Sequence, residues 1–190
     1  IVRKNGFDSY RTYNFSSSIG TTIYGTYSFK ETNKIQAIRH LIRPSISYGY
    51  TPSFERYYDY YTDNQGNYIS YSRFENTLLG APGLGVSNSI GIGISNSLEA
   101  KVLDAASKNG GTKKISLLNQ FNFSTSYNFT AEKFKLEPIN LIGGTTLFDN
   151  KLGVNFGARF DPYDVDSNNQ RINEFSINNG NGLARMTSSN

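Results

Sequence analysis

The chain has 190 residues, a formal net charge of +4 and no cysteine, which excludes a disulfide framework and a thiolate-bound metal. Its lysines and arginines are scattered along the sequence, which argues against nucleic-acid binding, and no run of 18 apolar residues is present to form a transmembrane helix. Hydrophobic residues make up 37% of the chain and aromatic residues 14%, a balance typical of a barrel with a polar lumen and an aromatic-girdled exterior.

The first expected strand spans residues 13–29, where apolar side chains occupy mostly odd positions. The phase does not change at Gly20, so we expect one long strand and not a hairpin. Residues 30–41 then form a charged connection. The second expected strand covers residues 44–54, and its limits are set by Pro44 and Pro52, because proline is largely confined to strand ends and edges.

Residues 54–76 are expected to form a long polar loop rich in tyrosine. Loops of this length are usually functional or disordered. The tyrosines could bind sugars, bind a partner protein or pack on one another over the mouth of a barrel. Those that begin this cluster are Tyr57, Tyr58, Tyr60 and Tyr61.

Residues 86–102 and 115–129 alternate apolar and polar side chains over about fifteen residues each. Soluble strands usually have about five or six residues, so this length favours strands that cross a bilayer. One face would contact lipid, and the other would line a polar lumen. The residues assigned to lipid are Val86, Ile90, Ile92, Ile94, Phe121 and Phe123. The residues assigned to the lumen are Ser89, Gly93, Ser95, Gln120 and Ser124.

The remaining chain predicts a turn over residues 104–112, a connection over 130–137 and two strands, 139–148 and 152–160, joined by a tight hairpin at Asp149 and Asn150. A polar loop, 161–170, precedes a weaker strand, 171–177. About seven strands are therefore expected, in an all-β, antiparallel up-and-down meander. We interpret residues 1–190 as part of a single transmembrane β-barrel domain; a soluble β-sandwich binding module is the alternative.

No catalytic, cofactor or metal site is predicted. His40 is the only histidine, and it falls in the expected turn before the second strand, so the chain is not expected to be an enzyme. Asp164, Asp166 and Asn168 have calcium-loop spacing, but Asn169 stands where that loop requires glycine.

Several stretches resemble the barrel domain of the LptD (OstA) lipopolysaccharide-assembly family, especially its Bacteroidota versions. The main one is the basic turn and proline-bracketed tyrosine strand of residues 39–54. Four others follow in the same order as in the family: residues 111–118, 123–129, 160–163 and 183–190.

The resemblance implies an internal piece of a larger outer-membrane barrel that inserts lipopolysaccharide into the outer leaflet. It also implies contact with outer-membrane lipid, an LptE-like lipoprotein plug in the lumen and a periplasmic bridge protein. In this orientation the tyrosine-rich loop is extracellular and residues 30–41 are periplasmic. The polar end at residues 186–190 would lead into another strand. A diffusion porin or other surface barrel is the alternative.

Overall fold

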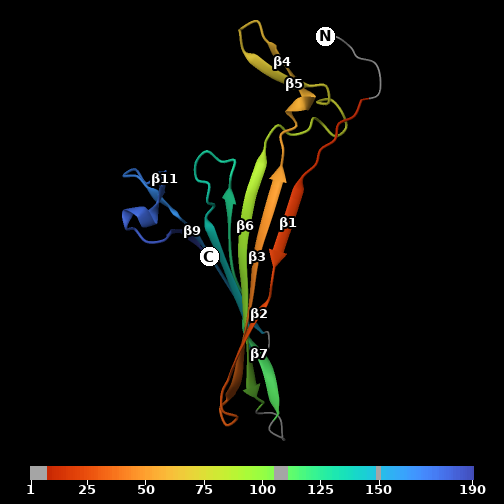
Figure 1. Cartoon of the computed structure of the whole chain (residues 1–190). Helices are drawn as coiled ribbons and strands as arrows, with labels where there is room; N and C mark the ends of the chain where they lie inside the picture. The colour runs from red at the N-terminus through yellow and green to blue at the C-terminus, as the bar shows by residue number, and fades with distance from the viewer. Residues whose placement is uncertain (1–7, 105–110, 149–150) are drawn as a thin grey trace. The chain divides into compact units, whose positions relative to one another are not determined.

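A computed structural model of the chain describes residues 8–104, 111–148 and 151–190. Its main element is an antiparallel sheet of eight strands, ordered β1-β3-β6-β7-β8-β9-β12, with β2 also paired to β3. Figure 1 shows β1, β3 and β6 side by side. The strands are β1 (Phe15–Gly20), β2 (Ile23–Ser28), β3 (Ile35–Thr51), β6 (Ser87–Leu103), β7 (Thr112–Asn128), β8 (Ile139–Leu147), β9 (Leu152–Asp161) and β12 (Arg185–Ser189). The predicted all-β, up-and-down fold is confirmed.

The strands alternate in direction, so their connections fall in two groups, one at each end of the sheet. One end carries the short connections 29–34, 104–111 and 148–151, of which residues 105–110 and 149–150 lie outside the described part of the chain. The other end carries the long connections 52–86, 129–138 and 162–184. The predicted turn at 104–112 and the hairpin at Asp149 and Asn150 therefore fall largely on undescribed residues, although Leu147 pairs with Leu152 across the hairpin.

Pro44 lies inside β3 and interrupts the neighbouring strand. Thr21 donates its amide proton to the Pro44 carbonyl oxygen (3.2 Å), but Pro44 has no amide proton to return to Thr21. The ladder resumes where Ile23 pairs with Ile42. The single strand expected over residues 13–29 is therefore two strands, β1 and β2, which both pair with β3 in the same register. The prediction that Pro44 begins the second strand is wrong, as is the charged connection over 30–41, because β3 begins at Ile35.

We expect Pro44→Ala to stabilise the sheet. Alanine supplies the amide proton that the Thr21 carbonyl lacks, and one such hydrogen bond contributes about 0.5–1.5 kcal/mol. Amide hydrogen exchange should show a protected proton on the new amide at position 44 and slower exchange at Thr22 and Ile23. An unprotected amide at position 44, or faster exchange in β1 and β2, would contradict this explanation of the break.

The β6–β7 ladder contains an irregularity that the sequence pattern does not reveal. Asn96 pairs with Phe121, Leu98 with Leu118 and Glu99 with Ser116, so the extra residues lie on β7. Such bulges bend the strand and increase its twist. The uninterrupted alternation expected over 115–129 is therefore wrong near Leu117, and Leu118 takes the place expected for Leu117, opposite Leu98.

Two small hairpins stand in the long connections, where polar loops were expected. The first joins β4 (Tyr58–Thr62) to β5 (Tyr68–Ser72), after the short 3-10 helix η1 (Glu55–Tyr57). The second joins β10 (Tyr163–Val165) to β11 (Arg171–Phe175), before η2 (Ser176–Asn179). The weak strand expected over 171–177 is thus β11, but it pairs with β10 and is not part of the main sheet.

Both hairpins use the same turn. The Asp63 carboxylate accepts the amide protons of Gln65 and Asn67, each at 2.8 Å, and the Asp166 carboxylate accepts those of Asn168 (2.9 Å) and Gln170 (2.8 Å). The fourth turn residue has positive φ in each: 83° at Gly66 and 61° at Asn169. Hydrogen bonds from Asn67, through its side chain first, lower the pKa of Asp63. The calcium-like spacing after Asp164 is therefore that of a hairpin turn.

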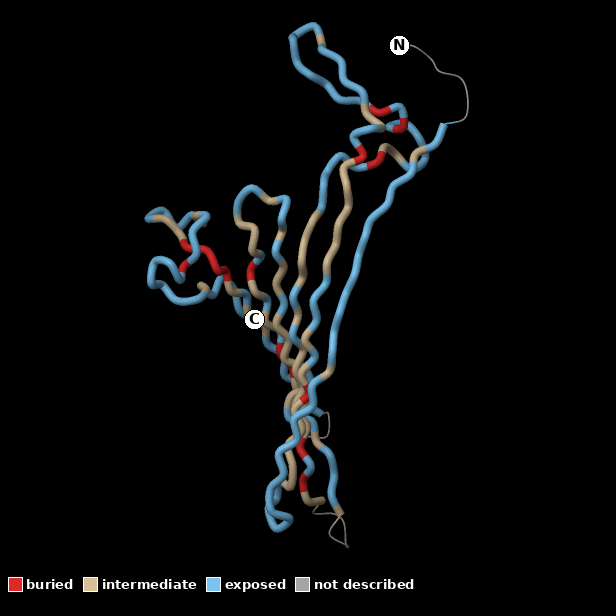
Figure 2. Tube along the Cα trace, in the orientation of Figure 1, coloured by how far each residue is buried: buried red, intermediate tan, exposed pale blue. Residues whose placement is uncertain are grey.

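Buried side chains are few, and they gather in two compact units. One unit contains Ile1–Ser16 and Gly49–Asn88, where Phe54 and Phe74 are buried. The other contains Ser17–Tyr48 and Ser89–Asn190, where Leu41, Ala100, Val102 and Tyr163 are buried. Most strand residues of the main sheet are only partly buried or exposed, as Figure 2 shows. Among the described residues, no second layer packs on the sheet as a sandwich would need.

Candidate membrane-spanning surface

The register of β6 with β7 separates two faces of the sheet. Ile94 lies opposite Phe123 and Ile90 opposite Tyr127, whereas Gly93 lies opposite Ser124 and Ser95 opposite Asn122. Directly opposite residues share a face, so these pairs define an apolar face and a polar face. The apolar face holds Ile90, Ile92, Ile94, Phe121 and Phe123. The polar face holds Ser89, Gly93, Ser95, Gln120 and Ser124.

Val86 is the exception among the predicted face residues. It comes one position before β6 and so lies outside the ladder. The sequence pattern assigns Val86 to the apolar face because the alternation of side chains does not show at which residue the strand begins to pair with its neighbour.

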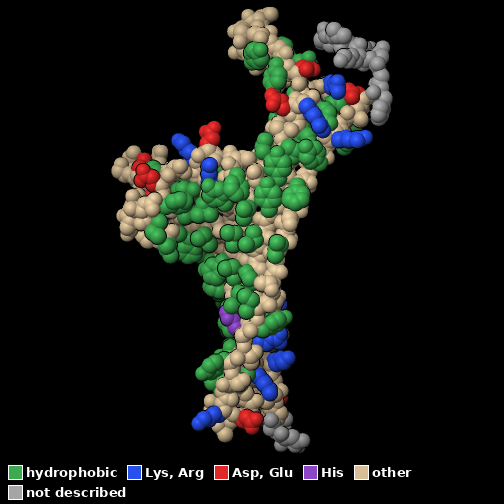
Figure 3. Space-filling model, viewed as in Figure 1, with side chains coloured by type: hydrophobic (Ala, Val, Ile, Leu, Met, Phe, Trp, Pro, Cys, Tyr) green, Lys and Arg blue, Asp and Glu red, His purple; other side chains and the backbone are tan. Residues whose placement is uncertain are grey.

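The apolar face continues across the neighbouring strands. Phe123 lies opposite Leu141 and Phe121 opposite Gly143; further along, Leu141 pairs with Ala158 and Gly143 with Phe156. The Phe121 and Phe123 rings meet edge to face, with centroids 4.8 Å apart. Many of these side chains remain open to the surroundings: Ile92 is 48% exposed and Phe156 38%. Figure 3 shows hydrophobic side chains gathered over the sheet.

Around Ser45, Gly93 and Ser95, the polar face is built from small and neutral side chains that lie close to the sheet. The Ser45 hydroxyl donates to the Gly93 carbonyl (3.4 Å), and the Ser95 hydroxyl donates to Asn122 Oδ1 (2.7 Å). A Cβ atom on Gly91 would lie 2.7 Å from Ser47 Oγ, so a side chain at this position would displace the Ser47 hydroxyl. Ile142, opposite Asn122, is an apolar residue on this face.

Charged side chains within β3, β6 and β7 lie almost entirely on the polar face. On β3, Arg39 and Arg43 share the alternation of Ser45; on β6, Glu99 and Lys101 share that of Ser95. On β7, Lys114 lies opposite Lys101. The exception is Lys113, which is opposite Val102, next to the first residue of β7. Glu99, Lys101 and Lys114 keep the polar alternation of the sequence, because the two extra residues in β7 restore its phase. Arg39 and Arg43 come before residue 44, where the second strand was expected to begin.

His40 lies within β3 and not in a turn, so that prediction is wrong. Its Nε2 is 3.2 Å from Asn96 Oδ1, and Asn96 Nδ2 donates to the Phe121 carbonyl (2.9 Å). The partly buried pair occupies the apolar face beside the β6–β7 irregularity. The two polar side chains satisfy each other there.

The tyrosines of the first long connection differ in exposure. Tyr57 packs edge to face on Phe74 (centroids 5.9 Å apart), and its hydroxyl donates to the Arg11 carbonyl (3.2 Å). The Tyr58 hydroxyl donates to the Pro82 carbonyl (2.6 Å). Tyr60 and Tyr61, about half exposed, project from β4. Two of the four tyrosines therefore hold the base of the hairpin, and two remain accessible.

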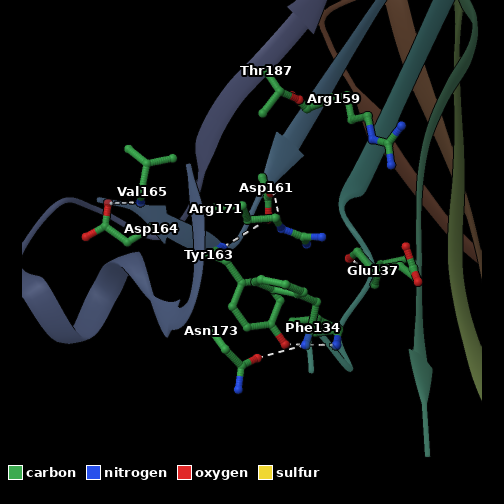
Figure 4. Close-up of polar contacts among 12 residues, drawn as sticks. Phe134, Glu137, Arg159, Asp161, Tyr163, Asp164, Val165, Arg171, Asn173 and Thr187 are labelled. Carbon is green, nitrogen blue, oxygen red and sulfur yellow. Dashed lines mark hydrogen bonds and ion pairs between the residues drawn. The ribbon is translucent and has the colours of Figure 1, made fainter. Parts of the chain in front are cut away.

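Arg171 and Asn173 both link the second hairpin to the connection between β7 and β8. Arg171 Nε lies 2.8 Å from Asp161 Oδ2, and the guanidinium carbon is 4.3 Å from the Phe134 ring centroid and 4.9 Å from that of Tyr163. The Asn173 side-chain oxygen accepts the Phe134 amide proton (2.7 Å), as Figure 4 shows. This contact supports the positive φ of 55° at Phe134.

Asp164, in the same hairpin, accepts hydrogen bonds from the side chains of Asn179 (2.9 Å) and Asn181 (2.8 Å) and from the Val165 amide (2.9 Å). These donors, Asn179 first, lower the pKa of Asp164. Within the described residues, no group of acidic, histidine or cysteine side chains is arranged to hold a metal ion.

No helix in the described residues is both long and apolar enough to cross a membrane. The class of protein follows from the strands: a long antiparallel meander with one apolar and one polar face is the construction of an outer-membrane-type β-barrel, here as part of one. Among known families, the model described as LptD protein matches residues 1–163, and the chain belongs to that family. No curated protein and no solved structure matches the chain.

Membership of this family connects the chain with lipopolysaccharide transport and outer-membrane assembly in general terms. The family resemblance noted from residues 39–54, 111–118, 123–129 and 160–163 is thereby confirmed, whereas the stretch at residues 183–190 lies outside the matched residues. The Bacteroidota-type assignment stays a prediction.

Proposed function

We propose that residues 1–190 are part of a single outer-membrane barrel domain that inserts lipopolysaccharide into the outer leaflet. The apolar face contacts lipid, and the polar face lines the lumen. The sugar-phosphate part of the substrate passes along the polar face while its acyl chains leave sideways into the bilayer. No covalent step is required.

The observation that carries this proposal is the distribution of charge. Charged side chains on a lipid-facing surface cost about 2–4 kcal/mol near the bilayer midplane, whereas charges facing the lumen do not. Arg39, Arg43, Glu99, Lys101 and Lys114 all lie on the polar face. Lys113, on the other face, lies next to a strand end, where a long side chain reaches the interface.

The lengths of the connections give the orientation. Outer-membrane barrels have short periplasmic turns and longer extracellular loops. These lengths support the proposal that the end with connections 52–86, 129–138 and 162–184 lies outside the cell, with Tyr60 and Tyr61 on the surface. An epitope inserted after Gln65 should be reached by antibody on intact cells; detection only after permeabilisation would reverse the orientation.

Partners follow from the same proposal. A wide polar lumen without a plug would be an open hole, so an LptE-like lipoprotein is proposed inside it, and a periplasmic bridge protein is proposed to deliver lipopolysaccharide. Outer-membrane lipid covers the apolar face, and no nucleic acid is involved.

Depletion of the full-length protein tests the function. Newly made lipopolysaccharide should accumulate inside the surface, and cells should become permeable to hydrophobic antibiotics. A lipoprotein should co-purify with the protein. Normal surface lipopolysaccharide after depletion, together with lost uptake of a small solute, would overturn the proposal in favour of a diffusion porin.

A further inference from the structure

Two lysines lie directly opposite each other on the polar face. Lys101 of β6 pairs with Lys114 of β7, and both side chains are exposed. Directly opposite residues have Cβ atoms about 4.5–5.5 Å apart, and like charges in this arrangement destabilise a sheet. In the described part of the chain, no carboxylate forms an ion pair with either lysine. The nearest acidic residue along β6, Glu99, is engaged by Arg39 at 3.9 Å.

An exogenous anion would remove this repulsion. A phosphate group offers several acceptor oxygens to two ammonium groups, and hydrogen bonds between ionised partners are the strong ones. We propose that the Lys101–Lys114 pair binds a phosphate group of an anionic amphiphile. This inference rests on the proposed function, which makes the polar face the lumen and the short-connection end the periplasmic entrance.

Further cations lie on the same face toward the other end of the sheet. Arg43 follows Arg39 by four residues on β3, about 13 Å at the rise of a strand. Beyond Arg43 the face becomes neutral, with Ser45 and Ser47. The cations therefore decrease from the entrance inward, so a phosphate is held first by Lys101 and Lys114 and next reaches Arg43. Figure 3 shows lysine and arginine side chains gathered at this end of the sheet.

A general solvated girdle of lysines would not explain this placement. Interfacial lysines of a barrel extend from the lipid side toward the headgroups, which is the position of Lys113. Lys101 and Lys114 belong to the opposite face. Lys113 is therefore a matched control, because it carries the same charge beside Lys114 but on the apolar face.

The test uses the full-length protein, purified in detergent with any partner that accompanies it. Binding is measured for the wild type, for Lys101→Gln/Lys114→Gln and for Lys113→Gln. The probes are lipopolysaccharide, the same lipopolysaccharide after chemical dephosphorylation, phosphatidylglycerol in mixed micelles and inorganic phosphate. The heat-dependent shift in gel mobility confirms that each variant is folded.

The double variant should bind phosphorylated lipopolysaccharide about tenfold or more weakly, as expected for lost charge-assisted hydrogen bonds, while its binding of the dephosphorylated form is unchanged. Lys113→Gln should bind like the wild type, and Lys101→Arg/Lys114→Arg should retain binding. A parallel loss of phosphatidylglycerol binding would assign the site to lipid headgroups in general; a parallel loss of inorganic phosphate binding would assign it to phosphate alone.

Equal wild-type affinity for phosphorylated and dephosphorylated lipopolysaccharide would overturn the inference, as would an equal loss in Lys113→Gln. Either result leaves the proposed function standing, because the facing of the sheet is tested separately by labelling. If labelling showed Lys101 and Lys114 exposed to lipid, the proposed function itself would fail.

Discussion

Ile92→Arg in the full-length protein should lower the free energy of unfolding in lipid vesicles by about 2–4 kcal/mol if the residue lies near the bilayer midplane. Ile92 stands between Ile90 and Ile94 on the apolar face and is 48% exposed in the described structure. On the proposed facing, an arginine there replaces hydrocarbon contact with a charge that has no aqueous surroundings. Denaturant titration, followed by the loss of the folded gel band, measures the change.

Ser124→Arg is the matched control. Ser124 lies opposite Gly93 on the polar face and is exposed; on the proposed facing, the guanidinium of the substituted arginine enters the lumen, and the expected change is within about 1 kcal/mol. Equal destabilisation by the two substitutions would show that the faces are not distinguished by their surroundings. Greater destabilisation by Ser124→Arg would invert the assignment.

Arg171→Leu should unfold the second hairpin locally. It leaves the Asp161 carboxylate, whose side chain is 8% exposed, without its cation and removes the guanidinium from the rings of Phe134 and Tyr163. Losing one partner of a buried pair costs about 3–5 kcal/mol; because the Arg171 side chain is 32% exposed, we expect about 2–3 kcal/mol. Hydrogen exchange of the Phe134 and Leu136 amides should accelerate, while that of β6 and β7 should not.

Two further variants separate charge from stacking. Arg171→Lys keeps the cation but loses the planar fork, so an intermediate effect is expected. Asp161→Asn combined with Arg171→Leu leaves no buried charge and should recover part of the lost protection. If Arg171→Leu alone left exchange unchanged, the arginine would not be what fastens this hairpin.

The alternation of β6 was predictable because β6 itself carries no extra residue, so every second side chain stays on one face. The same rule gives the wrong face near Leu117, since extra residues in β7 change the phase and carry no mark in the sequence. Pro44 is the reason that the start of β3 was predicted wrongly. Proline usually ends a strand, but β3 continues through Pro44, and the interruption falls in the neighbouring strand, at Thr21. As a result, the sequence pattern places Arg39 and His40 in a turn.

The surface hairpins were missed for another reason. Each is stabilised by an aspartate turn and by contacts between residues distant in sequence, such as Arg171 with Phe134. The alternation of apolar and polar residues does not predict such contacts. The sign available was the spacing of Asp63 from Gly66 and of Asp166 from Asn169. The Lys101–Lys114 pair required the register of β6 with β7.

The facing of the sheet is tested most directly by single-cysteine labelling. Residues 1–190 contain no cysteine, and any cysteine elsewhere in the full-length protein is first replaced by serine. Cysteines at Ile92 and Ile94 are compared with cysteines at Gly93 and Ser95, in the full-length protein in native membranes. Positions 92 and 94 should react with lipid-embedded maleimides and resist charged aqueous reagents, and positions 93 and 95 should show the reverse. Aqueous labelling at 92 and 94 with lipid labelling at 93 and 95 would contradict the proposed membrane-spanning surface.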